Sequence, residues 1–186
     1  MKKIVLGTLM LLLTSFICVS QDFRGATWGM SQIQVKSSES IRPIIETSDL
    51  ITYKTTLAGF ETYVGYVFAK GKLVRAKYVL TETHSNKNDF LTDYYSLNEL
   101  LKKKYGPPIE NETIWNSDSY LKDDKSNWGY SIRQGDLILY TIYSSSETEI
   151  QIRLSAVDYQ IFNEIQYSST DVELISLEAE KLLEGF

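Results

Sequence analysis

Hydrophobic and polar residues alternate along two long stretches of the chain, residues 50–82 and 109–168. Successive side chains of a strand point to opposite faces, so this period of two predicts half-buried β-strands. In the first stretch, Ala58-Gly59 and Lys70-Gly71 are typical of tight hairpin turns. We therefore expect three antiparallel strands, a β-meander, over residues 50–82.

The second stretch predicts another meander, with strands at residues 109–115, 128–133, 137–143 and 148–156. The polar segment 116–127 is expected to form an exposed loop. The apolar residues of segment 159–167 fit a helix as well as a strand. Because this segment is rich in β-branched and aromatic residues, we expect a strand.

Between the two stretches, residues 88–105 have the period of an amphipathic helix. The apolar residues on its main face are Phe90, Tyr94, Leu97 and Leu101. Asn88 is placed to cap the first turn through its side chain, and Gly106, followed by two prolines, is placed to end the helix. We expect the apolar face of this helix to cover the first meander.

Two further helices are predicted near the ends of the chain. Ser31 and Gln34 have the spacing of a capping box, which predicts a short helix from Gln32 to about Ser38. Thr170 and Glu173 repeat that spacing before a helix over residues 170–184. The expected fold class is α+β, with antiparallel β-meanders and packed helices in one domain over residues 21–186. The order of elements suggests two related helix-plus-sheet halves, 21–108 and 109–186.

The first twenty residues have the features of a signal peptide. Lys2 and Lys3 precede an almost uninterrupted apolar segment, and Cys18-Val19-Ser20 places small residues before a cleavage point. We therefore expect a secreted or periplasmic protein, cleaved after Ser20, with no transmembrane span thereafter. Lipid attachment at Cys18 is the alternative, which Ile17 disfavours because lipoprotein processing prefers a small residue there.

Cleavage after Ser20 would leave a chain without cysteine, which excludes disulfides and cysteine ligands from the mature protein. It would also change the net charge from −5 to −7, which argues against nucleic acid as a partner. A catalytic interpretation of the only histidine, His84, makes it a general base that is oriented by Glu82 or Asp89. No nucleophile motif accompanies it, and a solvated loop histidine is the simpler interpretation. We expect no metal site and no cofactor.

Two short motifs carry a resemblance. The first is F-x4-W-G-M-S-x3-V after the apolar leader, and the second is K-Y-G-x-P; the matching residues are Phe23, Trp28, Gly29, Met30, Ser31, Val35, Lys104, Tyr105, Gly106 and Pro108. In these motifs the chain resembles a family of uncharacterised secreted bacterial proteins. More distantly, it is similar to the helix-plus-sheet modules of β-lactamase-inhibitor-like proteins and of small outer-membrane assembly lipoproteins. The resemblance implies modules that act through their surfaces, and it supplies no catalytic residues.

The best candidate for a ligand-binding site is an aromatic group, Trp115, Tyr120 and Trp128, which flanks the polar segment. Aromatic faces stack on sugars and peptides, but ordinary core packing also explains such residues. The leading hypothesis is a non-enzymatic module that binds a protein or another envelope component. The alternatives are a hydrolase that uses carboxylates such as Asp118, Asp123 or Glu147, and a structural partner that pairs through an exposed sheet edge.

Overall fold

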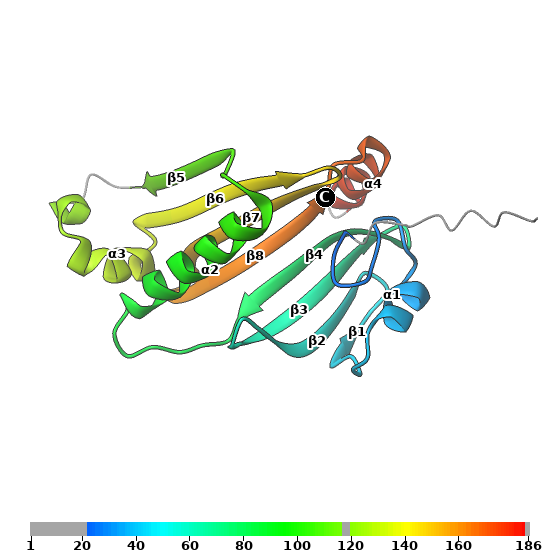
Figure 1. The fold of residues 1–186 in the computed structure, drawn as a ribbon, viewed down its shortest axis with the longest axis horizontal. Coiled ribbons are helices and arrows are strands. Elements are labelled where there is room, and N and C mark those ends of the chain that lie inside the picture. Colours follow the sequence, from blue (N-terminus) through cyan, green and yellow to red (C-terminus); the bar gives the residue numbers. More distant parts are fainter. Residues whose placement is uncertain (1–21, 117–119, 185–186) are drawn as a thin grey trace, which may run out of the picture.

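The computed structural model describes residues 22–116 and 120–184 (Figure 1). The predicted signal peptide, with Cys18, and the side chain of Tyr120 lie outside the described residues. The described strands are β1 (Ile45–Glu46), β2 (Leu50–Leu57), β3 (Phe60–Ala69), β4 (Lys72–Leu80), β5 (Glu110–Trp115), β6 (Leu137–Ser145), β7 (Thr148–Val157) and β8 (Gln160–Ser169). The described helices are α1 (Gln32–Ser38), α2 (Asp89–Tyr105), α3 (Trp128–Gln134) and α4 (Val172–Leu183), with 3-10 turns at Tyr120–Asp123 and Lys125–Asn127.

All eight strands form one antiparallel sheet in the order β1-β2-β3-β4-β8-β7-β6-β5. Each meander runs from an edge of the sheet to its middle, where the last strands of the two meanders, β4 and β8, pair with each other. The α+β prediction is confirmed, and β8 confirms a strand at residues 159–167. The contact between the meanders is therefore a seam between two strands that are far apart in sequence.

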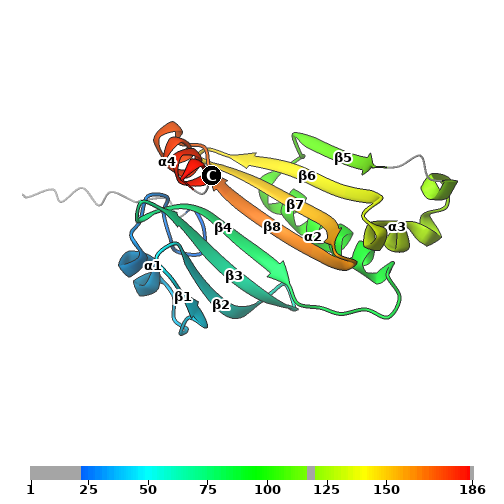
Figure 2. The ribbon, with the colours of Figure 1, turned by 180° about the vertical axis from the view of Figure 1, so that it is seen from behind.

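The two faces of the sheet differ in character. The face that carries α2 in Figure 1 is apolar and buried, and Ile51, Val64, Ile152 and Ile165 are among its fully or almost fully buried residues. The opposite face, seen in Figure 2, is polar, and α4 covers one end of it. There Arg75 of β4 pairs with Glu178 of α4 at 2.6 Å.

The apolar face of the first meander is covered by the segment before α1, not by α2. Phe23 is buried there against the rings of Tyr66, Tyr78 and Tyr167. The helix α1 begins with the predicted capping box, in which Ser31 and Gln34 bond each other's backbone N–H groups.

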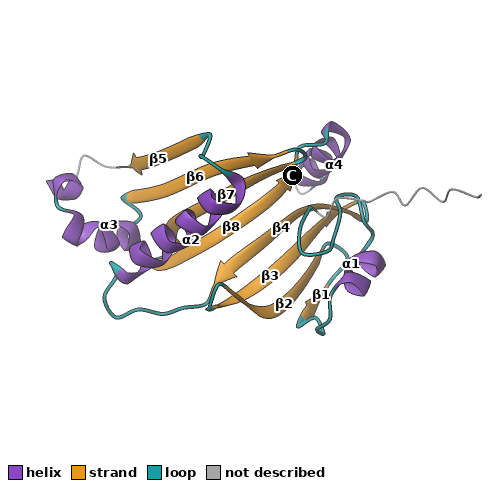
Figure 3. Cartoon of the chain, viewed as in Figure 1, coloured by secondary structure: helices purple, strands orange, loops and turns teal. Residues whose placement is uncertain are grey.

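The helix α2 lies over β6, β7 and β8, so the expectation that it covers the first meander is wrong. Figure 3 shows it in front of β7 and β8. The hydroxyls of Tyr94 and Thr141 lie 2.8 Å apart, and the Tyr143 hydroxyl donates to the backbone oxygen of Asn98 at 3.1 Å. The helix ends as predicted at Gly106, which has a φ of 87° and donates its N–H to the Lys102 carbonyl.

Residues 128–133 form the helix α3, so the predicted strand is wrong. Ile132 is on the buried side of this helix, and Gly135 ends the helix in the left-handed conformation. The Asn88 side chain was expected to cap α2, but it does not. Instead, its oxygen accepts a hydrogen bond from the Gly129 N–H of α3 at 2.7 Å. Similarly, Asp171 caps α4 in place of Thr170, because its carboxylate reaches the Glu173 N–H at 2.7 Å.

Candidate functional site

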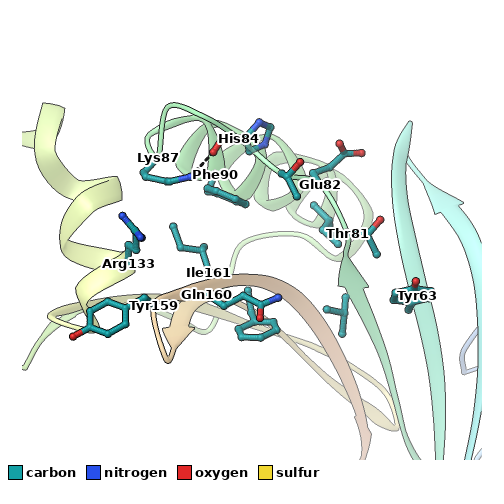
Figure 4. Close-up of a pocket in the computed structure, with 14 residues that line it drawn as sticks. Tyr63, Thr81, Glu82, His84, Lys87, Phe90, Arg133, Tyr159, Gln160 and Ile161 are labelled. Carbon is teal, nitrogen blue, oxygen red and sulfur yellow. Dashed lines mark hydrogen bonds between the residues drawn. The ribbon is translucent and has the colours of Figure 1, made fainter.

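The two central strands are paired along only part of their length. The ladder between β4 and β8 runs from Arg75↔Ser168 to Val79↔Glu164. Beyond it, β8 continues to pair with β7, whereas Thr81 follows β3 by donating its N–H to the Glu61 carbonyl at 3.0 Å. A cavity of about 670 Å³ lies where the strands part (Figure 4).

This cavity is called the groove below. It is lined by Tyr63 of β3, residues 79–84 at the end of β4, Lys87 and Phe90 near the start of α2, Arg133 of α3, and residues 159–162 at the start of β8. In Figure 4, His84, Lys87 and Phe90 lie on one side, and Tyr159, Gln160 and Ile161 lie on the other. Segments from both meanders therefore form the groove.

Aromatic side chains give the groove its apolar surface. Tyr63, Phe90 and Phe162 are half-buried or exposed, and Tyr159 is 65% exposed. Pockets that bind ligands usually combine such apolar surface with a few polar groups that fix the orientation of the ligand. The groove has this composition.

Tyr159 occupies a backbone conformation that large side chains rarely adopt. The two-residue turn between β7 and β8 is Asp158-Tyr159, with φ angles of 49° and 63°. The equivalent turns Ala58-Gly59 and Lys70-Gly71 place glycine at the second position, where it has no side chain to clash. A bulky residue at positive φ is an outlier that often marks a functional position.

Two cations border the groove near Tyr159. The ammonium of Lys87 donates to the His84 carbonyl and lies 5.8 Å from the centre of the Phe90 ring. Arg133 is exposed, and within the described residues no ion pair holds it. The groove therefore has a cationic end in a chain whose net charge is −5.

The imidazole and the carboxylate that line the groove, those of His84 and Glu82, are bonded to protein groups. His84 Nε2 lies 2.6 Å from Asp93 Oδ2, which is neither of the two carboxylates expected to orient it. Its ring packs edge-on against Phe90 at 4.6 Å. The Glu82 carboxylate accepts a hydrogen bond from the Glu61 N–H at 3.1 Å. In the described part of the chain no hydroxyl is bonded to His84, so a serine–histidine pair is not formed.

A close contact between α3 and the start of α2 fixes the cationic end. A Cβ on Gly129 would lie 2.2 Å from the Lys87 carbonyl carbon and 2.5 Å from the Asn88 nitrogen. The Asn88 amide also donates to the carbonyls of Lys125 and Ser126, at 3.1 and 2.9 Å. These contacts set the position of Lys87 relative to Arg133.

Of the predicted aromatic site, the structure brings Trp115 and Trp128 together. Their rings meet edge to face at 5.9 Å, and both are half-buried against the main core. The Trp128 indole N–H donates to the Lys122 carbonyl, and Lys125 lies 5.2 Å from the centre of its ring. These contacts are those of packed side chains, and ligand binding by Trp115, Tyr120 and Trp128 stays a prediction.

The proposed catalytic carboxylates do not form a described pair. Asp118 lies outside the described residues. Asp123 precedes α3, whereas Glu147 lies in the turn after β6, and the nine residues of β6 span about 30 Å between those ends (Figure 1). Glycosidase carboxylates lie roughly 5–10 Å apart, so Asp123 and Glu147 do not have this arrangement.

Among residues 22–116 and 120–184, no three His, Cys, Asp or Glu side chains are grouped so that they could bind a metal ion. The same residues contain no helix of the length and apolar character needed to cross a membrane. Comparisons of the chain with protein families, with curated proteins and with solved structures find no match.

Proposed function

We propose that this chain is a non-enzymatic binding module, secreted or periplasmic, that binds a protein component of the cell envelope through the groove. The observation that carries the proposal is the open seam itself. It leaves an aromatic cavity with a cationic end in the middle of an otherwise continuous sheet. A sheet that only needed stability would gain by pairing β4 and β8 along their whole length.

The contacts within the groove support binding more than catalysis. Asp93 engages His84, and the Glu61 N–H engages Glu82. A general base needs a nearby proton to abstract, and a nucleophile needs an adjacent base. Tyr159 and Arg133, by contrast, are exposed at the groove and available to a partner.

Pairing through the sheet edge is a second candidate, and β5 favours it. Five of its six residues are exposed, and its outer edge is longer than that of the two-residue strand β1. Thr113→Pro would remove a backbone donor from this strand. If pairing through β5 is the function, we expect sedimentation analysis to show an assembly for the parent protein that this variant loses.

Affinity capture from the cell envelope of the source organism tests the groove. We compare the parent protein with Arg133→Glu and with Lys103→Glu, a charge reversal on the exposed side of α2 outside the groove. We expect the parent and the Lys103 variant to retain the same protein and the Arg133 variant to lose it. Equal retention by all three would contradict the proposal.

A further inference from the structure

We infer that the groove binds an extended acidic peptide segment of a partner protein, which adds as a strand to the open edge of β8. This inference rests on the proposed function and specifies the chemistry of the partner. It follows from three features of the groove: the free backbone edge, the side chains that border this edge, and the charge at one end.

The backbone of β8 faces the groove at Ile161. Val157 and Gln160 pair across a two-residue turn, so the backbone N–H and C=O of Gln160 are directed toward β7. Backbone groups alternate in direction along a strand, so those of Ile161 are directed away from β7, into the seam. The last β4 partner is Val79, opposite Glu164, and Ile161 lies three residues beyond that pair.

No backbone hydrogen bond joins Ile161 to the described residues on the other side of the groove. Unpaired backbone groups at a sheet edge are a template for another strand. Extended peptides bind other domains by adding to such an edge, where backbone hydrogen bonds supply affinity and side-chain pockets supply specificity.

A buried polar side chain beside this edge is also unpartnered. Asn163 is 2% exposed, and within the described residues neither its amide oxygen nor its amide nitrogen has a hydrogen-bond partner. A buried amide without a partner costs about 1–3 kcal/mol. Asn163 lies on β8 one residue beyond the last β4 pair, where β4 departs, but it does not line the groove.

The walls of the groove suit the alternating side chains of a strand. Phe90 and Ile161 lie on the helix-covered side of the sheet, and Tyr63 and Phe162 lie on the polar side, by the alternation of their strands. Successive side chains of an inserted peptide would therefore each meet an apolar wall. A branched or compact glycan would not use this alternation.

The charge at one end selects an acidic segment. Arg133 lies between Lys87 and Tyr159 at one end of the groove (Figure 4), and the nearby carboxylates of Glu82 and Asp93 are bonded to Glu61 and His84. Carboxylates on the peptide would pair with the two cations, and complementary charge favours one partner over another. The strained position of Tyr159 holds an aromatic ring at the same end.

The test uses the purified protein and a synthetic ten-residue peptide, blocked at both termini, in which Asp and Glu alternate with Val and Thr. One comparison peptide carries Lys in place of the acidic residues, and another is N-methylated at every second residue. We measure binding by fluorescence anisotropy and hydrogen exchange of the Ile161 amide by NMR. Arg133→Glu and Tyr159→Gly are the groove variants, and Lys103→Glu is the control.

We expect the acidic peptide to bind and to slow exchange at Ile161. We expect Arg133→Glu to weaken binding by about fivefold and Lys103→Glu to leave it unchanged. N-methylation should weaken it by about tenfold, since it removes the donors of a strand ladder. Preference for the lysine peptide would overturn the acidic partner.

Two further outcomes separate this inference from the proposed function. If the N-methylated peptide binds equally well and Ile161 is not protected, strand addition is wrong, although binding in the groove stands. If no peptide binds but envelope capture still depends on Arg133, the partner has a different chemistry, such as a glycan, and this inference is overturned. If capture is also independent of Arg133, both proposals fail.

Discussion

The two ends of the β4–β8 seam are built differently. At the paired end, Tyr78 and Tyr167 pack with the buried Phe23 on one face, and Lys77 pairs with Glu164 at 3.1 Å on the other. At the parted end, Phe90, Ile161 and Phe162 stay half-buried around the groove. One end thus holds the two meanders together, while the other exposes the apolar and cationic surface that a partner can use.

The largest expected effect is at the paired end. Phe23→Ala removes a ring that lies 4.7–5.5 Å from three tyrosine rings, and we expect it to lower the free energy of unfolding by about 3–5 kcal/mol. Phe162→Ala at the parted end is the matched control, with a loss of roughly 1–2 kcal/mol. Urea denaturation measures both, and equal losses would remove the distinction between the two ends.

The next effect concerns the contact that fixes the cationic end. Gly129→Ala places a methyl group against the backbone of Lys87, so α3 must shift, at a cost of about 1–3 kcal/mol. Gly65→Ala is the control, because the nearest atom to its Cβ would be a Leu50 side-chain carbon at an ordinary 3.5 Å. Denaturation should show a clear loss only for Gly129→Ala, and unchanged stability there would refute the close contact.

The sequence allowed much of this scaffold to be predicted, because local signals determine it. Glycines mark two hairpin turns, Ser31 and Gln34 form the capping box, and Gly106 ends α2. The helix α3 was missed because residues 128–133 contain too few apolar side chains to distinguish the period of a helix from that of a strand. The position of α2 was wrong because the pattern shows that a helix is apolar on one face, but not which strands it meets.

The groove could not be predicted because it depends on where two strands, more than eighty residues apart, stop pairing. Lys87, Arg133 and Tyr159 come from three separate elements, and no local motif unites them. One signal was present: the turn before β8 has Tyr159 at the position where the turns after β2 and β3 have glycine. The only histidine, His84, was considered as a general base with Glu82 or Asp89 as its partner. Its actual partner, Asp93, lies nine residues further along the chain, inside α2.

The stability of the protein should depend on pH because of the ion pair between Arg24, which follows Phe23, and Glu39. Burial raises the pKa of Glu39, but hydrogen bonds from Arg24 and Tyr66 outweigh burial, so the pKa is lowered overall. A carboxylate with a lowered folded-state pKa contributes stability above its unfolded pKa of about 4.3 and loses that contribution as the pH falls through the folded value.

Glu39→Gln should therefore be less stable than the parent protein near pH 7, with a difference that shrinks below about pH 4. Denaturation at pH 7, 5, 4 and 3 measures this difference. A constant difference across that range would show that the ionised carboxylate is not what stabilises the paired end.

The smallest effect is at the turn before β8. Tyr159→Gly relieves the strain of a left-handed conformation, which costs about 1–2 kcal/mol. The larger conformational entropy that glycine loses on folding offsets about 0.5–1 kcal/mol of this gain. We expect a net gain of about 0.5–1 kcal/mol together with weaker capture of the partner. Ala58→Gly, with a φ of 52°, should show a similar gain with capture unchanged. Loss of stability at Tyr159 would contradict the strain.

The most direct test of the seam compares amides within β8 of the free protein. Ile165 pairs with Tyr78 and Tyr167 pairs with Ala76, whereas Ile161 has the same orientation but no partner across the seam among the described residues. Hydrogen exchange followed by NMR should show the Ile161 amide exchanging at least about 100-fold faster than those of Ile165 and Tyr167. Equal protection at the three positions would mean that the seam is closed along its length, and the groove could not serve as a binding site.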